Sequence, residues 1–348
     1  MTNILVAFTP YHILLFLALM SARKEENNIL FVVPEFPDAE RFIKALKEES
    51  PFKEVILLPN VINGSAVKKG WARWRGSRII REKVKSMVVD TVYVCNDARA
   101  ESQTALYYAK RGNLRARGVY IEDGMAAYWS HTASRRILRS IARKVTAGKW
   151  SEEIMVVGTS SWIDESLLLF PKHARPELRE KPILPFPQES LRGLRNHPFL
   201  AHIAERFSEQ ERSMDALFLP PHSKFFKQNP SGAEYFHSLL KKNKGSKIAV
   251  KYHPKEEEDF LHAKEAGAAI VSQEIPAELL YMILQKTPEY IIGDMTTALY
   301  TARLLLPKAC IISVALLVGR RDERILHMFG ELGIRLPTTE KEMTNLLL

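Results

Sequence analysis

Two adjacent carboxylates followed by a glycine are the first groups in the sequence that could move a proton. Glu122 and Asp123 come directly after the apolar residues 119–121, which predict a buried strand, and Gly124 permits a tight turn out of it. One carboxylate can accept a proton from an attacking hydroxyl while the other holds a backbone donor or a basic group. The residues alone do not decide between the two roles. An ordinary Asp-Gly turn beside a solvated glutamate is the alternative.

A histidine held by the residue after it could supply a second catalytic group. His253 and Pro254 follow a strand predicted over 247–251, which ends in Lys251. The proline biases His253 toward an extended backbone, so the direction of the imidazole is restricted. A protonated imidazole there can hydrogen-bond to a leaving phosphate and neutralise its charge. A turn histidine without a partner is the alternative.

Hydroxyl groups near the start of a helix could bind an anion. Thr296 and Thr297 follow a strand predicted over 290–292, and backbone N–H groups at the start of the next helix attract negative charge. Glu278 opens an earlier helix, where its carboxylate could accept hydrogen bonds from a ribose. Simple helix capping by threonine and a first-turn glutamate that stabilises the helix dipole are the alternatives.

Further polar residues follow other predicted strands. Because the carboxyl ends of parallel strands meet at one edge of a sheet, we expect these residues to lie near a ligand, with a purely structural role as the alternative for each. They are Thr9, Tyr11, His12, Asn96, His222 and Ser223.

Apolar runs alternate with helical stretches along the chain, which predicts parallel sheets with helices on both faces. Residues 170–198 contain six prolines and predict an extended crossing between two domains, 1–185 and 186–348, followed by a helix over 199–212. The simplest α/β arrangement has two doubly wound, Rossmann-like domains that face a central cleft, as in GT-B glycosyltransferases. The predicted strands are 4–8, 29–33, 55–58, 92–95, 119–121, 155–157, 216–219, 247–251, 269–271, 290–292 and 310–314.

Composition excludes several classes of protein. The 348 residues are 46% hydrophobic and 26% charged, which is typical of a globular chain of about two domains. Only Cys95 and Cys310 could ligate zinc through sulfur or form a disulfide, and they are far apart, so a reducing compartment is expected. The glycine-rich phosphate-binding motifs of dinucleotide-binding and P-loop proteins do not occur, nor does an Asp-X-Asp metal motif.

The charge favours an anionic partner. Fifty basic and 40 acidic residues give a net charge of +10. Basic stretches at 71–85 and 134–149 suit an anionic membrane or an acidic glycan, with a solvated face as the alternative. Nucleic acid is not expected, because no recognised binding module accompanies the charge. The apolar residues 4–20 are interrupted by Pro10 and are short for a membrane span, so we expect a cytoplasmic protein that could be peripheral at the inner membrane face.

The order of these motifs resembles that of bacterial GT-B sialyltransferases, which include lipooligosaccharide sialyltransferases and capsular polysialyltransferases. The resemblance implies inverting transfer from CMP-sialic acid to a hydroxyl of a bacterial surface glycan or glycolipid. It implies Glu122 as the general base and His253 as the group that assists CMP departure. Asp123 is the other candidate for the base. A threonine pair stands where serine is common in the family.

The resemblance also implies which residues bind each substrate. Thr296 and Thr297 would bind the donor phosphate and Glu278 its ribose. Because one phosphate leaves with less charge than a diphosphate, no metal or other cofactor is expected. Another activated sugar, or a non-catalytic protein that binds anionic ligands, is the alternative. From their places at or after predicted strand ends, and not from the resemblance, we further expect Gly124, His222, Ser223, Lys251 and Pro254 on the donor side and Thr9, Tyr11, His12 and Asn96 on the acceptor side.

Overall fold

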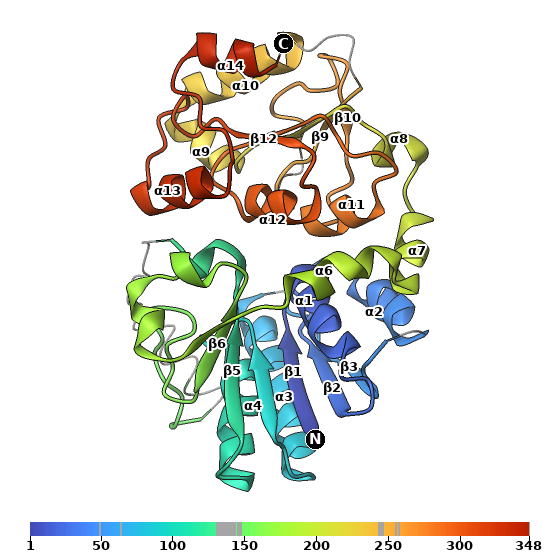
Figure 1. Cartoon of the computed structure of the whole chain (residues 1–348). Helices are drawn as coiled ribbons and strands as arrows, with labels where there is room; N and C mark the ends of the chain where they lie inside the picture. The colour runs from blue at the N-terminus through green and yellow to red at the C-terminus, as the bar shows by residue number, and fades with distance from the viewer. Residues whose placement is uncertain are drawn as a thin grey trace. The chain divides into compact units, whose positions relative to one another are not determined.

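The chain folds into two α/β units, each built on one parallel sheet. The computed structural model describes residues 1–48, 50–62, 65–129, 144, 148–242, 247–254, 256 and 258–347. The chain divides into the compact units Met1–Leu194 and Arg195–Leu348, which are shown in Figure 1. The predicted α/β class is confirmed.

The first unit contains a seven-stranded sheet in the order β3-β2-β1-β4-β5-β6-β7. Its neighbouring strands all pair in parallel. The order reverses between β1 and β4, and sheets of this kind bind ligands outside the carboxyl ends of the strands at such a point. The strands are β1 (Thr2–Ala7), β2 (Asn27–Val32), β3 (Glu54–Leu57), β4 (Thr91–Val94), β5 (Arg117–Ile121), β6 (Glu165–Leu168) and β7 (Ile183–Pro185).

The apolar start of the chain folds as β1 and α1 (Pro10–Ser21). The Thr9 side chain accepts a hydrogen bond from the His12 N–H and caps α1, and Pro10 occupies the first turn, where it removes no helical hydrogen bond. Both elements are buried, which explains the long apolar run. The other helices that the structure describes in this unit are α2 (Ala39–Glu48), α3 (Ala66–Lys85), α4 (Ala100–Gly112), η1 (Gly124–Ala127), η2 (Pro171–His173), η3 (Pro176–Glu180) and α6 (Gln188–Gly193).

The end of the first unit differs from the prediction. Residues 155–157 are a loop rather than a strand, and the loop is held by backbone N–H groups of Gly158 and Ser160 that donate to the buried Asp97. The segment 170–198 is not simply an extended crossing, because it contributes β7 to the sheet. β7 tolerates proline because it is an edge strand.

The second unit contains a five-stranded parallel sheet in the order β10-β9-β8-β11-β12. Its order reverses between β8 and β11. The helix predicted over 199–212 is two short helices, because Ser208 begins a new one with a capping box. The elements are α7 (Pro198–Ala204), α8 (Glu209–Arg212), β8 (Ala216–Leu219), α9 (Ser223–Gln228), α10 (Pro230–Lys242), β9 (Ile248–Val250), β10 (Ala269–Ile270), α11 (Ala277–Ile283), β11 (Tyr290–Gly293), α12 (Thr297–Leu305), β12 (Cys310–Ser313), α13 (Glu323–Glu331) and α14 (Glu340–Leu346); the short η4 (Leu194–Asn196) crosses the boundary between the units.

The chain offers no membrane-spanning helix within the residues that the structure describes, since none there is both long and apolar enough. The predicted basic helix over 134–149 lies outside the described residues, except for residues 144, 148 and 149.

Candidate active site

Glu122 lies at the carboxyl end of β5 and is hydrogen-bonded to three other segments of the first unit. Its side chain is fully buried. The Tyr11 hydroxyl donates to Oε1 at 3.0 Å, the Leu169 backbone N–H donates to Oε2 at 2.7 Å, and the Tyr128 hydroxyl also donates to Oε2. The carboxylate therefore ties α1, the chain after η1 and the chain after β6 to the end of β5.

Asp123, the next residue, is the carboxylate that solvent reaches. Its side chain is 29% exposed, and the His12 Nε2 lies 2.9 Å from Oδ1. The Asn96 amide donates to Oδ2 at 2.8 Å. Gly124 has a φ of +55°, a conformation that glycine adopts readily, and turns the chain into η1. Three strand ends, those of β1, β4 and β5, thus meet around one carboxylate.

The backbone fixes which nitrogen of His12 carries the proton. The Phe8 N–H donates to His12 Nδ1 at 3.2 Å, so Nδ1 acts as an acceptor. A proton on Nε2 then donates to Asp123. Burial would raise the pKa of Asp123, but His12, Asn96 and the nearby Arg99 together hold that pKa below its ordinary value. Asp123 is therefore ionised at neutral pH and can accept a proton.

A charged network lies at the same edge of the first sheet. Arg73 of α3 pairs with Glu35, which follows β2, and with the buried Glu101 of α4. Arg99 pairs with the same Glu35 at 2.8 Å. The network fixes the first turns of α3 and α4 beside the carboxyl ends of the strands.

In the second unit, two histidines follow adjacent strands. His222 comes after β8 and His253 after β9, and their ring centroids are 5.0 Å apart. The buried Glu256 lies 2.7 Å from His222 Nδ1 and accepts the Ser223 backbone N–H through the same oxygen. Its own N–H donates to the His253 carbonyl. Glu256 could not be predicted from the sequence, because its role depends on contacts made between separate loops.

A buried lysine, Lys251, directly follows β9. Lys251 is 5% exposed, and burial lowers its pKa to about 8 although Glu278 opposes the shift. Glu278, near the start of α11, accepts a hydrogen bond from the Thr301 hydroxyl at 3.3 Å. Burial raises the pKa of Glu278, while Thr301 and Lys251 oppose that shift. The ammonium group is thus held in a place where an anion would relieve its desolvation.

The end of β11 carries the threonine pair. Thr296 caps α12 by accepting the Ala298 N–H at 3.4 Å, and Thr297 is the first residue of that helix. The Asp294 side chain before them is buried and pairs with Arg320 through Oδ2. Its Oδ1 has no hydrogen-bond partner among the described residues. Pro254 is exposed in the loop after β9.

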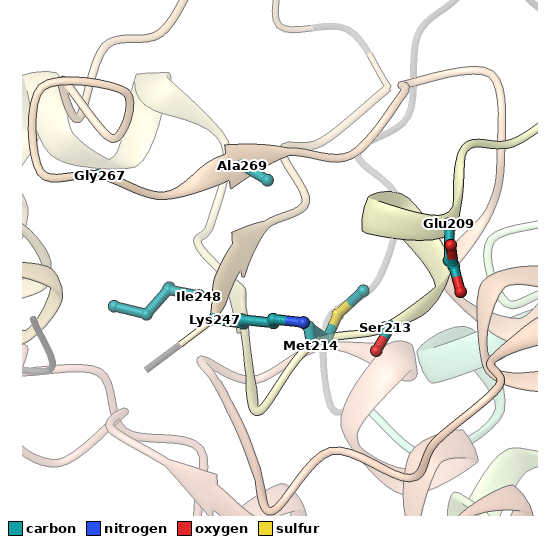
Figure 2. Close-up of a pocket in the computed structure, with 7 residues that line it drawn as sticks. All are labelled: Glu209, Ser213, Met214, Lys247, Ile248, Gly267 and Ala269. Atoms are coloured by element: carbon teal, nitrogen blue, oxygen red, sulfur yellow. The ribbon is translucent and has the colours of Figure 1, made fainter. Parts of the chain in front are cut away.

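A cavity in the second unit lies at the opposite edge of the sheet (Figure 2). Its volume is about 320 Å³. Met214, Ile248 and Ala269 place it at the amino ends of β8, β9 and β10, whereas the two histidines follow carboxyl ends. The cavity is therefore separate from the candidate active-site residues. Its lining is completed by Glu209, Ser213, Lys247 and Gly267.

Solved structures of other proteins have a similar fold. A crystal structure of an α/β-galactoside α-2,3-sialyltransferase from Photobacterium phosphoreum has a TM-score of 0.56 and 9% identity, covering 98% of this chain and 97% of that chain. A UDP-GlcNAc 2-epimerase from Neisseria meningitidis has a TM-score of 0.56 and 13% identity, covering 97% and 95%. The GT-B domain of a sialyltransferase from Photobacterium damselae has a TM-score of 0.50 and 11% identity, covering 96% and 98%. The fold is therefore GT-B, as predicted.

The family is shown by the sequence. The family model of alpha-2,8-polysialyltransferase (POLYST) matches residues 3–315, and the chain belongs to this family. No curated protein matches the chain. The predicted resemblance to bacterial GT-B sialyltransferases is confirmed. The chain is accordingly a glycosyltransferase of the sialyltransferase class, which uses a nucleotide-sugar donor and a glycan acceptor.

Proposed function

We propose that the protein transfers sialic acid, with inversion, from CMP-sialic acid to a hydroxyl of a bacterial surface glycan or glycolipid, such as lipooligosaccharide or capsule. The family match over residues 3–315 carries this proposal. The family description also favours an α-2,8 linkage to a sialic acid already on the acceptor. The acceptor oxygen attacks the anomeric carbon as the bond to the CMP phosphate breaks, through a transition state of oxocarbenium character.

Asp123, rather than Glu122, is the general base in this proposal. A base must reach the proton that it removes, and the Asp123 side chain is 29% exposed whereas Glu122 is fully buried. Both oxygens of Glu122 already accept hydrogen bonds from protein donors. Glu122 is then a positioning residue that sets where β5 ends and therefore where Asp123 stands.

The predicted acceptor-side residues support Asp123 in this mechanism. His12 and Asn96 donate to its two oxygens and restrict its rotation. Tyr11 supports Asp123 indirectly, because its hydroxyl donates to the neighbouring Glu122. Thr9 fixes the start of the helix that carries Tyr11 and His12. Proton transfer then starts from a carboxylate that is already oriented, which lowers the cost of reaching the transition state.

The second unit handles the donor in this proposal. His253 donates a hydrogen bond or proton to the phosphate oxygen that leaves with CMP, and His222 contributes a second imidazole. Lys251 offsets the negative charge of the donor, and Glu278 accepts from the ribose. Thr296 and Thr297 bind the phosphate at the start of α12.

We propose that transfer needs no metal ion. A nucleoside monophosphate leaves with less charge than a diphosphate, and two imidazoles, an ammonium group and a helix start can offset it. Turnover after dialysis against EDTA should match turnover before it. Loss of turnover that returns with Mg²⁺ would contradict this part of the proposal.

A donor panel tests the proposed function. The enzyme is incubated with CMP-sialic acid and a sialylated oligosaccharide, and CMP release is compared with release of the nucleotide from CMP-Kdo and UDP-GlcNAc. We expect release from CMP-sialic acid that depends on the acceptor. Turnover of another donor alone would assign a different activated sugar, and failure of every donor to bind would remove the catalytic proposal.

A further inference from the structure

One face of α3 presents tryptophans and cations to solvent. Trp71 is 56% exposed, Trp74 is 42% exposed and Val67 is 82% exposed. Their spacing along the helix puts them on one side, together with exposed charged residues. We call this set the α3 face: Val67, Trp71, Trp74, Arg75, Arg78, Glu82 and Lys85.

The rest of α3 is held firmly on the first unit. Ala72, Gly76, Ile80 and Val84 are buried. Arg73 pairs with Glu35 and with Glu101 of α4. The tryptophans are therefore exposed although the opposite side of α3 packs against the first unit.

The charge of α3 is strongly one-sided. The helix has eight lysines and arginines and one acidic residue, Glu82, which pairs with Arg78 at 2.7 Å. Exposed indoles lower their free energy at the boundary between apolar chains and water, because one part of the ring is apolar and the N–H is polar. Cations beside them are attracted to anionic headgroups.

We propose that the α3 face binds an anionic lipid membrane. The tryptophans and Val67 would enter the interface, and Arg75, Arg78 and Lys85 would remain at the headgroups. Such contact is peripheral and reversible, since one helix face buries little apolar area. The proposal stands independently of the donor and of the transfer reaction.

The stacking of the tryptophans favours a membrane over an acidic glycan. The Arg75 guanidinium lies 5.5 Å from the centroid of the Trp71 ring, and the Arg78 guanidinium lies 6.0 Å from that of Trp74. A sugar stacks on an open ring face, and an arginine over one face of each indole leaves only the other face for stacking. An exposed valine also offers nothing to a sugar, whereas a lipid interface accommodates it.

The α3 face begins near the edge of the first sheet at which the carboxyl ends of its strands lie. Arg73, within the same turns as Trp71 and Trp74, contacts residues that follow β2 and open α4. Asp123 lies at the carboxyl end of β5, at this same edge of the sheet. A membrane bound there would bring an acceptor displayed on lipid close to the carboxylate proposed as the base.

Vesicle sedimentation of the full chain, without donor or acceptor, tests this proposal. The vesicles contain phosphatidylcholine alone or phosphatidylcholine mixed with phosphatidylglycerol. The variants are Trp71→Ala with Trp74→Ala, and Arg75→Gln with Arg78→Gln. The matched control is Leu114→Ala with Arg115→Gln, which removes an exposed apolar residue and a cation after α4.

We expect the wild type to sediment with anionic vesicles only, and less at high salt. The arginine pair should weaken binding about thirtyfold, as expected for two cations at an anionic surface. The tryptophan pair should weaken it by at least about tenfold. The control should bind like the wild type, and all variants should keep the wild-type unfolding temperature.

Several results would overturn the assignment. If the tryptophan variant and the arginine variant both bind vesicles as well as the wild type does, the membrane contact lies on another surface. If the wild type binds neutral vesicles equally well, the anionic headgroup is not the partner. If the wild type does not bind vesicles but binds heparin, and both variants lose heparin binding, the α3 face recognises an acidic glycan instead. None of these results changes the expectation for donor turnover, so failure here leaves the proposed function standing.

Discussion

The carboxyl edges of the two sheets differ in how fully their polar groups are paired. In the first unit, Glu122 and Asp123 receive hydrogen bonds from five groups on other segments. In the second unit, the ammonium group of the buried Lys251 makes one hydrogen bond within the described residues, to the Tyr252 carbonyl at 3.4 Å. Asp294 keeps a buried oxygen without a partner in that part of the chain.

This difference indicates what each edge is ready to do. A carboxylate held by fixed donors needs no rearrangement before it accepts a proton. A buried cation whose desolvation Glu278 offsets only in part destabilises the folded protein until an anion arrives. This difference supports the proposal that the first edge carries out proton transfer and that the second binds a charged donor.

The largest expected effect is that of Asp123→Asn. An amide cannot accept the hydroxyl proton, so transfer should fall by about 10²–10⁴-fold, as is typical for loss of a general base. CMP release in the presence of acceptor measures the effect. The comparison variant is Glu122→Gln, which leaves the Asp123 carboxylate itself intact.

Glu122→Gln should act on stability rather than on chemistry. The glutamine can keep an oxygen for the Leu169 N–H, but its NH2 replaces the oxygen that accepts from the Tyr11 hydroxyl, and the charged acceptor is lost, which costs about 1–3 kcal/mol. Thermal unfolding should show this loss, while transfer per folded molecule falls far less than in Asp123→Asn. The reverse pattern would return the role of base to Glu122.

The next largest effect belongs to the second edge. His253→Ala should lower transfer by about 10²-fold, because the leaving phosphate loses a donor. Single-turnover CMP release measures this step directly. A wild-type rate in the variant would show that His253 has no role in CMP departure.

Lys251→Met should stabilise the protein and weaken the enzyme. The lysine pKa is about 8 in the folded chain and about 10.4 when unfolded, so its burial costs about 3 kcal/mol at neutral pH. Between these values the unfolded state binds more protons, so the free energy of unfolding of the wild type should rise with pH. Urea unfolding at pH 7 and pH 10 measures this.

In Lys251→Met, the free energy of unfolding should no longer rise between pH 7 and pH 10, and the urea midpoint at pH 7 should be higher than in the wild type. Lys227→Met, which removes an exposed lysine of α9, is the control and should change neither. A lower midpoint for Lys251→Met than for the control would mean that the ammonium group is already well paired.

The smallest effect should come from Thr296→Val. The valine removes the cap of α12 and costs about 1 kcal/mol of stability. If the hydroxyl also binds the donor phosphate, the KM for the donor should rise while kcat changes little. Thr296→Ser keeps the hydroxyl and should restore both values.

Much of the fold could be predicted because its strands are short, apolar and separated by helices. β1, β2 and β4 carry continuous apolar residues, since helices cover both faces of the sheet. The prediction failed at the edge of the same sheet. β6 has the sequence Glu-Ser-Leu-Leu, and β7 includes a proline, so neither has the apolar signal of a central strand.

The candidate site could be predicted by position but not by role. The sequence indicated that Glu122 and Asp123 lie at the end of a strand, and both do. Which of them faces solvent depends on donors from Tyr11, Tyr128 and Leu169, which come from three distant segments. Adjacent residues of the same type give no local signal for such a difference.

The central claim is that the first edge supplies the general base, whereas the second binds the donor and assists its departure. Titration calorimetry of CMP into the full chain tests it most directly, because CMP binding requires no transfer. We predict that Asp123→Asn binds CMP as tightly as the wild type, whereas Lys251→Met binds it about tenfold more weakly or worse. Loss of CMP affinity in Asp123→Asn with full affinity in Lys251→Met would contradict the account.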